Sequence, residues 1–185
     1  MSSAIDPCRP IDAREVASFT AETDVLVVGY GGAGACAALE ADSLGADVIL
    51  LEIASAGGGT TAMSGGQIYL GGGTPLQRAC GFDDTREDME AYLLVASNGN
   101  ADLEKVRAYC EGSVEHFEWL VKQGVVFNPE YYAGKHTNSP EYQSLLWSGN
   151  EKGWRERQAA RPMPRSHKPK AFWEDGGATL MASLR

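Results

Sequence analysis

The sequence is poor in basic residues and contains no long apolar run. Lys and Arg together number 16, against 25 Asp and Glu, which gives a net charge of −9. Phosphate backbones would be repelled by this excess of acid, so we expect no nucleic-acid partner. No stretch reaches the roughly 18 consecutive apolar residues of a membrane-spanning helix. We therefore also expect no membrane span.

The four cysteines are not arranged as a metal site. Cys8, Cys36, Cys80 and Cys110 are widely separated, and no histidine is spaced to complete a zinc site with them. We therefore expect no metal. The even count allows two disulfides, but the 185 residues are enough for a core and the first twelve do not resemble a secretory leader. These features favour reduced thiols and a cytoplasmic protein.

The composition is that of a folded domain or part of one, and its glycines are clustered. The chain is 43% hydrophobic and 22% charged, and 13 of its 22 glycines lie between Gly29 and Gly73. The clusters have no fixed period, so they indicate a set of loops and exclude a repeat architecture.

A strand, a helix and a second strand follow one another within 30 residues. Residues 24–28 form a β-branched apolar run, residues 33–44 are rich in alanine, and residues 46–51 form another apolar run that ends at Glu52. The two apolar runs are typical of buried parallel strands. The sequence therefore predicts an α/β fold with a Rossmann-like βαβ unit and an incomplete parallel sheet.

The remaining chain divides into a helical part and a loop-rich part. We expect an N-terminal extension over 1–23, the βαβ unit and glycine loops over 24–77, helices over 85–124 and loops over 125–175. Thr85 predicts the start of one helix ending near Ala96, and a second helix is predicted over 102–123. Residues 178–185 look like the opening turns of another helix.

Gly29, Gly31 and Gly34 fit the pattern G-x-G-x-x-G between the first strand and the helix. In this pattern the first glycine makes a tight turn, the second admits a pyrophosphate, and the third lets helix and strand pack closely. Glu52 stands where a carboxylate accepts hydrogen bonds from ribose and repels a 2′-phosphate, which favours FAD or NAD over NADP. The alternative is a glycine turn that binds no ligand.

A second glycine cluster covers residues 57–66. A plain NAD-binding domain does not need such an insertion, whereas FAD needs a second backbone cradle near its ribityl chain and ring. The cluster therefore favours FAD, and the alternative is a flexible surface loop.

These segments resemble a known family, the FAD-binding domain of the fumarate reductase and succinate dehydrogenase flavoproteins. The resemblance lies in residues 24–34, 45–52 and 58–66. Residues 65–77, 80–84 and 109–116 are similar to the 3-ketosteroid dehydrogenase branch of that family.

The resemblance implies a set of cofactor contacts. The pyrophosphate would be held by the first loop, the adenosine ribose by Glu52, and the flavin side by the second loop. These residues are Gly29, Gly31, Gly32, Ala33, Gly34, Glu52, Gly59, Thr60, Thr61, Ser64, Gly65 and Gly66. The membrane-bound members attach FAD to a histidine, but His116, His136 and His167 lie outside the cradle, so non-covalent FAD is expected.

The resemblance also implies an oxidoreductase that moves a hydride between a substrate carbon and FAD, with a small, 3-ketosteroid-like substrate. Family members are more than twice as long, so we expect an N-terminal fragment that is inactive alone, with catalytic residues outside it. The alternatives are a fumarate-type reductase of unsaturated acids and a truncated flavin-binding module without catalysis.

We expect no role in the chemistry for two further features and leave the role of a third open. His116 is expected to be solvated or to cap a helix, and the basic stretch 151–170 to be a solvated loop. The aromatic residues Tyr131, Tyr132, Tyr142 and Trp147 either line an apolar cleft or anchor the loop region, and the sequence leaves both open.

Overall fold

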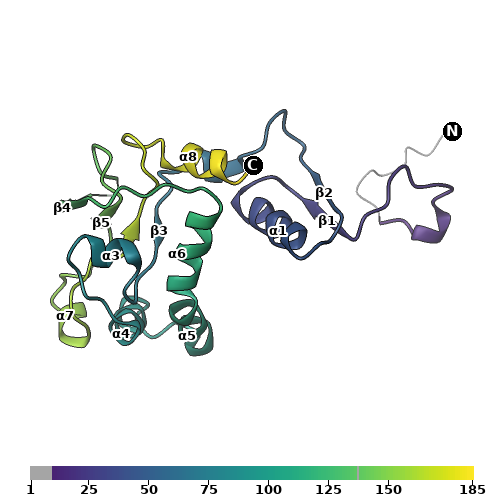
Figure 1. Ribbon diagram of the computed structural model, residues 1–185. Coiled ribbons are helices and arrows are strands. Elements are labelled where there is room, and N and C mark those ends of the chain that lie inside the picture. Colours follow the sequence, from purple (N-terminus) through teal and green to yellow (C-terminus); the bar gives the residue numbers. More distant parts are fainter. Residues whose placement is uncertain (1–9, 137) are drawn as a thin grey trace, which may run out of the picture.

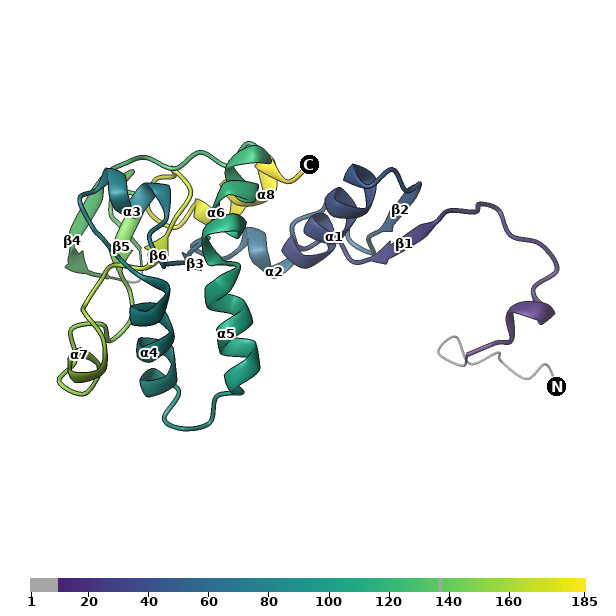
Figure 2. The same cartoon turned by 60° about the horizontal axis from the view of Figure 1, so that its bottom comes forward.

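The computed structural model describes residues 10–136 and 138–185. It has two parts, a small βαβ unit and a larger body of helices around a short sheet (Figure 1). A 3₁₀ turn, η1 (Ala13–Glu15), precedes the βαβ unit, and the helices α2 (Gly59–Ala62) and α8 (Gly176–Ser183) pack together where the two parts meet (Figure 2).

The predicted βαβ unit is present. β1 (Val25–Val28) pairs in parallel with β2 (Val48–Leu51), with Val25 opposite Val48, and α1 (Gly32–Ser43) connects them. The expectation that both strands are buried is wrong. Leu26 is 57% exposed, Val28 79% and Leu51 49%. The physical reason is that side chains alternate across a strand, and α1 covers one face of this two-stranded sheet, leaving the other open.

Two capped helices follow the glycine loops and the short strand β3 (Ile68–Tyr69). α3 (Pro75–Ala79) begins with a capping box between Thr74 and Gln77. α4 (Arg86–Ala96) begins at Thr85, whose side chain accepts a hydrogen bond from the Asp88 amide. The predicted helix of 85–96 is therefore confirmed at both ends.

The predicted single helix of 102–123 is wrong in its continuity. The structure has α5 (Leu103–Glu111) and α6 (Ser113–Lys122), which meet at Gly112. Glycine weakens a helix interior, and the buried Ser113 Oγ accepts a hydrogen bond from the Gly71 amide at 2.8 Å, which fixes the chain at this junction. The apolar stripe is kept, since Cys110, Phe117 and Leu120 are buried.

The segment predicted as loops contributes a sheet. β4 (Tyr131–Lys135), β5 (Leu145–Trp147) and β6 (Ser166–His167) join β3 in the order β3-β6-β5-β4, and β4 with β5 is the parallel pair. α7 (Glu156–Ala159) lies between β5 and β6. Tyr131 packs on Phe82, with ring centroids 4.9 Å apart, and on Trp147, which favours anchoring for these two aromatic residues.

The expectation of a solvated loop over 151–170 is wrong for three of its basic residues, whereas Lys170 is exposed. Arg165, His167 and Lys168 are fully buried. Arg165 forms a bidentate ion pair with the buried Asp84, at 2.8 and 2.7 Å. Lys168 Nζ donates to three backbone carbonyls, those of Ser139, Glu141 and Trp173. Asp84 lies 81 residues before Arg165, and Ser139 and Glu141 lie 29 and 27 residues before Lys168. A prediction from neighbouring residues alone misses these partners and therefore places the two charged side chains in solvent.

The expected helix near residue 180 is present as α8, with Leu180 and Met181 buried. They join a core cluster that draws on α1, the loop after β3, α3, α6, β5 and α8 and contains Ala35, Leu70, Leu76, Phe117, Leu120, Val125, Leu145, Leu180, Met181 and Leu184. Among the described residues, no helix combines the length and the apolar character needed to cross a bilayer.

Candidate cofactor-binding site

The first glycine loop leaves open space at the start of α1. Gly29 has a φ of +100°, which favours glycine. A Cβ on Gly34 would lie 1.9 Å from the Gly29 carbonyl oxygen, so only glycine lets α1 pack this closely. Gly31 is the N-cap of α1, and a Cβ there would meet nothing within 4 Å. A ligand can therefore approach the backbone at Gly31.

The first turn of α1 suits an anion. It carries no acidic side chain, and the unpaired amides and positive dipole end of a helix N-terminus favour negative charge. Ala33 is exposed in this turn. The amide of Gly32 is already used, since it donates to Thr61 Oγ1 at 3.1 Å. Thr61 thus ties the second glycine cluster to the first loop.

Glu52 is attached to the first loop by its carboxylate. Oε2 accepts from the Tyr30 amide at 2.7 Å, and Oε1 accepts from the Ala54 amide at 2.8 Å. The hydrogen bonds from these two amides lower the pKa of Glu52, and the larger effect comes from the Ala54 amide. A charged carboxylate is therefore held beside the glycine turn with lone pairs left for hydroxyl donors.

The second glycine cluster packs directly on the first loop. A Cβ on Gly57 would lie 2.1 Å from the Tyr30 ring, and one on Gly59 would lie 3.3 Å from the Gly31 Cα atom. The Gly58 amide donates to the Tyr30 carbonyl at 2.6 Å. The two clusters, separated by more than 20 residues in the sequence, therefore form one continuous backbone surface.

The end of the second cluster is a turn built on Ser64. Its hydroxyl donates to the Thr61 carbonyl at 2.8 Å and accepts from the Gly66 amide at 3.1 Å. A Cβ on Gly66 would lie 2.2 Å from the Gly176 carbonyl carbon, so part of the need for glycine here is close packing against α8. Thr60 is exposed, and its carbonyl accepts from the Met63 amide.

A cavity of about 330 Å³ adjoins this turn, lined by Ser64, Gly65, Gly66, Gln67, Asn138 and Ser148. Its volume falls in the range of small-molecule pockets, roughly 300–1,000 Å³. The sequence missed Asn138 and Ser148 because both lie about 70 or more residues beyond the cluster, and no local pattern links an isolated Asn or Ser to a distant glycine loop.

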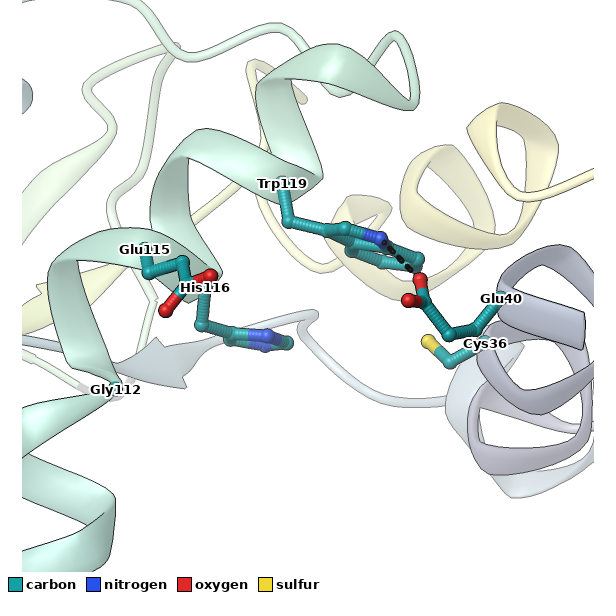
Figure 3. A pocket seen from close by; sticks show the side chains of 6 residues that line it. All are labelled: Cys36, Glu40, Gly112, Glu115, His116 and Trp119. Carbon is teal, nitrogen blue, oxygen red and sulfur yellow. Dashed lines mark hydrogen bonds between the residues drawn. The ribbon is translucent and has the colours of Figure 1, made fainter. Parts of the chain in front are cut away.

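A second cavity, of about 350 Å³, lies between α1 and α6 (Figure 3). Glu40 Oε2 accepts a hydrogen bond from Trp119 Nε1 at 3.1 Å across it, and Cys36 and His116 also face it. Partial burial raises the pKa of Cys36 and lowers that of His116. The His116 side chain is exposed to solvent overall, as expected, although the part of its ring that lines the cavity is desolvated, and this cavity shares no lining residue with the glycine loops.

Known proteins match this chain along most of its length. A family model described as "FAD binding domain" matches residues 24–181. A 3-oxo-5-alpha-steroid 4-dehydrogenase from Comamonas testosteroni is 34% identical over 178 residues, which is 95% of this chain and 33% of that protein.

Solved structures agree with the sequence matches. The structure of a 3-ketosteroid-delta4-(5alpha)-dehydrogenase from Rhodococcus jostii RHA1, in complex with 4-androstene-3,17-dione, superposes with a TM-score of 0.90 at 44% identity. The match covers 95% of this chain and 38% of that one. A flavocytochrome c3 fumarate reductase superposes with a TM-score of 0.65 at 29% identity, over 88% of this chain and 24% of that one. The chain thus spans 24% to 38% of the length of these relatives.

Proposed function

The chain belongs to the family of FAD-binding domains, and from this membership we propose that it is the FAD-binding part of a flavin-dependent oxidoreductase. The reaction proposed is hydride transfer between a substrate carbon and FAD. The family, the α/β fold and the FAD cofactor agree with the sequence predictions. The observation that carries the proposal is the single backbone surface formed by the two glycine clusters beside the Glu52 carboxylate.

The residues at this surface fit FAD. The open side of Gly31 and the first turn of α1 suit a pyrophosphate, and the charged Glu52 suits ribose hydroxyls. The turn at Ser64 borders the cavity proposed for the flavin side. We assign the pyrophosphate to Gly29, Gly31, Gly32, Ala33 and Gly34, the ribose to Glu52, and the flavin side to Gly59, Thr60, Thr61, Ser64, Gly65 and Gly66.

Bound FAD supplies the site that accepts or donates the hydride. The chain's own part is to bind and orient it. The amides of the first turn of α1 other than that of Gly32, which donates to Thr61 Oγ1, hold the pyrophosphate, and Glu52 excludes a 2′-phosphate by charge. We propose non-covalent binding, because none of the residues assigned to the cradle is a histidine. Acid or heat denaturation should then release all the flavin into the supernatant.

A 3-ketosteroid-like substrate is the first candidate. Its support is the 44% identity with a structure described in complex with 4-androstene-3,17-dione. Reduction of an unsaturated acid is the second candidate, supported by the likeness to a fumarate reductase at 29% identity. A flavin-binding module without catalysis is the third.

We propose that residues 24–185 form the N-terminal portion of the FAD-binding domain and that 1–23 are an extension. The extension's residues 1–9 and Cys8 lie outside the described residues. Cys36, Cys80 and Cys110 are free, which supports a reducing, cytoplasmic location as a proposal. Fractionation of the source cell tests it.

Isothermal titration with FAD tests the cofactor proposal. Heat that saturates at one site per chain is expected, and no binding would refute the assignment. Substrate class is tested on a longer protein that carries this chain, by following the flavin absorbance. Reduction of the flavin by 3-ketosteroids supports the first candidate, whereas reoxidation by fumarate-like acids alone supports the second. FAD binding without turnover of either class supports the third.

A further inference from the structure

The Asn138 side chain lies directly against the second glycine cluster. It is 8% exposed, and a Cβ built on Gly65 would lie 2.2 Å from Asn138 Oδ1 and 2.8 Å from Nδ2. Any residue other than glycine at position 65 would push this amide away. The absence of a side chain at Gly65 thus places the Asn138 amide at the cavity wall.

A hydrogen-bonded relay sets the orientation of that amide. Ser166 Oγ donates to Gln67 Oε1, and Gln67 Nε2 donates to Asn138 Oδ1 at 3.0 Å. The relay spans two paired strands, because Gln67 immediately precedes β3 and Ser166 lies in β6. Since Oδ1 is the acceptor, the Nδ2 group is the one left to donate. Within the described part of the chain it has no hydrogen-bond partner.

The backbone around Asn138 is held in place as well. The Asn138 amide donates to His136 Nδ1 at 3.1 Å. The buried Lys168 Nζ donates to the carbonyls of Ser139 at 3.2 Å and Glu141 at 3.3 Å, one and three residues further along the same loop. The donor at the cavity wall is therefore fixed before a ligand arrives.

We propose that Asn138 is a cofactor-binding residue whose Nδ2 group donates a hydrogen bond to the carbonyl-bearing edge of the flavin ring, and that Gln67 is the positioning residue for its amide. The inference rests on the proposed function. All six residues that line this cavity are uncharged, which suits a neutral ring with carbonyl acceptors better than a phosphate. The Nδ2 group borders the cavity and has no hydrogen-bond partner among the described residues, and a flavin carbonyl would supply one.

The chemistry gives the proposal a redox signature. Reduction places additional negative charge on the carbonyl-bearing edge of the flavin, so a donor at that edge stabilises the reduced form more than the oxidised form. Asn138 therefore raises the midpoint potential of bound FAD, in addition to strengthening its binding.

The test compares Asn138→Ala, Asn138→Asp and Gln67→Glu with the wild-type protein and with Asn100→Ala, an exposed asparagine, as the matched control. Asn138→Ala should raise the Kd for FAD by roughly two- to tenfold and lower the midpoint potential. Asn138→Asp should lower the potential further by adding negative charge.

Gln67→Glu keeps the shape of the relay but presents only acceptors to Asn138. The Asn138 amide should then rotate and turn Oδ1 to the cavity, and this rotation, together with the negative charge added at position 67, lowers the potential without any change at Asn138 itself. This variant also carries the test if Asn138→Ala does not fold, as judged by circular dichroism and the thermal midpoint.

The outcomes separate this inference from the function on which it rests. If the wild-type protein binds FAD but the Asn138 and Gln67 variants retain its affinity and potential, the inference is wrong and the proposed function stands. If the wild-type protein does not bind FAD, both are wrong. A lowered potential in the Asn138 and Gln67 variants and not in Asn100→Ala supports the inference.

Discussion

Glu52 links the two functions of the first loop, since one carboxylate holds the loop backbone and faces the proposed ribose site. Glu52→Ala removes a charged acceptor that FAD hydroxyls cannot replace. We expect the Kd for FAD to rise by roughly one to two orders of magnitude, measured by the quenching of flavin fluorescence. Glu22→Ala, an exposed glutamate just before β1, is the control. Unchanged affinity in Glu52→Ala would refute the ribose role.

His167 is a buried residue with a consequence for stability against pH. Its Nε2 is 2.7 Å from Thr74 Oγ1 and its Nδ1 is 3.0 Å from the Arg165 carbonyl oxygen. Burial lowers the pKa of His167 to about 4, although the Arg165 carbonyl opposes the shift. In the unfolded chain the pKa is about 6.5.

The sign of the pH effect follows from proton counting. Between about pH 6.5 and pH 4 the unfolded chain binds a proton at His167 and the folded chain does not, so the free energy of unfolding falls as pH falls. Over that window His167 lowers the free energy of unfolding by about 3 kcal/mol. Above about pH 6.5 this loss does not occur. Urea unfolding at several pH values measures it. His167→Gln should flatten the dependence and the exposed His136→Gln should not; an equally steep dependence in His167→Gln would contradict the assignment.

At the scale of elements, two glycines at the junction of β1 and α1 have different roles. Gly34 is required for packing, and Gly31 leaves space for the ligand. A Cβ at Gly34 would strike the Gly29 carbonyl oxygen, so Gly34→Ala should destabilise the βαβ unit by about 1–3 kcal/mol, as overpacking does. A Cβ at Gly31 meets nothing within 4 Å among the described residues, and the φ of −92° at Gly31 suits alanine.

Gly31→Ala should therefore leave the thermal midpoint unchanged while weakening FAD binding, because the added methyl group occupies the space assigned to the pyrophosphate. Thermal unfolding and FAD titration of both variants provide the measurement, with each variant as the control for the other. Full FAD affinity in a folded Gly31→Ala protein would exclude that space as the pyrophosphate site.

The elements that the sequence predicted are those determined by near neighbours in the chain. The cap at Thr85 and the βαβ unit around Gly29 depend on residues a few positions apart or on one short crossover. The ion pair of Asp84 with Arg165 joins residues 81 positions apart, and Asn138 reaches Gly65 across 73 positions. Side-chain periodicity carries no information about such pairs, which is why the second sheet and the cavity wall were not predicted.

At the scale of the whole molecule, the chain has a core but leaves one sheet face open. We define the open face as Leu26, Val28 and Leu51, of which Val28 and Leu51 are opposite one another in β1 and β2. An apolar strand face next to unpaired strand edges promotes association. Since the chain spans 33% and 38% of the two steroid dehydrogenases described above, we expect this face to be covered by further chain in a longer protein.

The same double substitution in the open face should therefore have different effects in the 185-residue chain and in a longer protein that covers the face. In the 185-residue chain, Leu26→Ser with Val28→Ser should reduce both the binding of a hydrophobic dye and self-association, with a change in unfolding free energy below about 0.5 kcal/mol per site. Phe172→Ser, which removes an exposed aromatic residue of the larger body, is the control and should not reduce self-association to the same degree.

In a longer protein that covers the face, the same double variant should lower the free energy of unfolding by roughly 1–3 kcal/mol per site, because buried apolar contacts are removed. Equal, small effects in both proteins would show that the face stays exposed, and the parallel sheet would then end at these two strands.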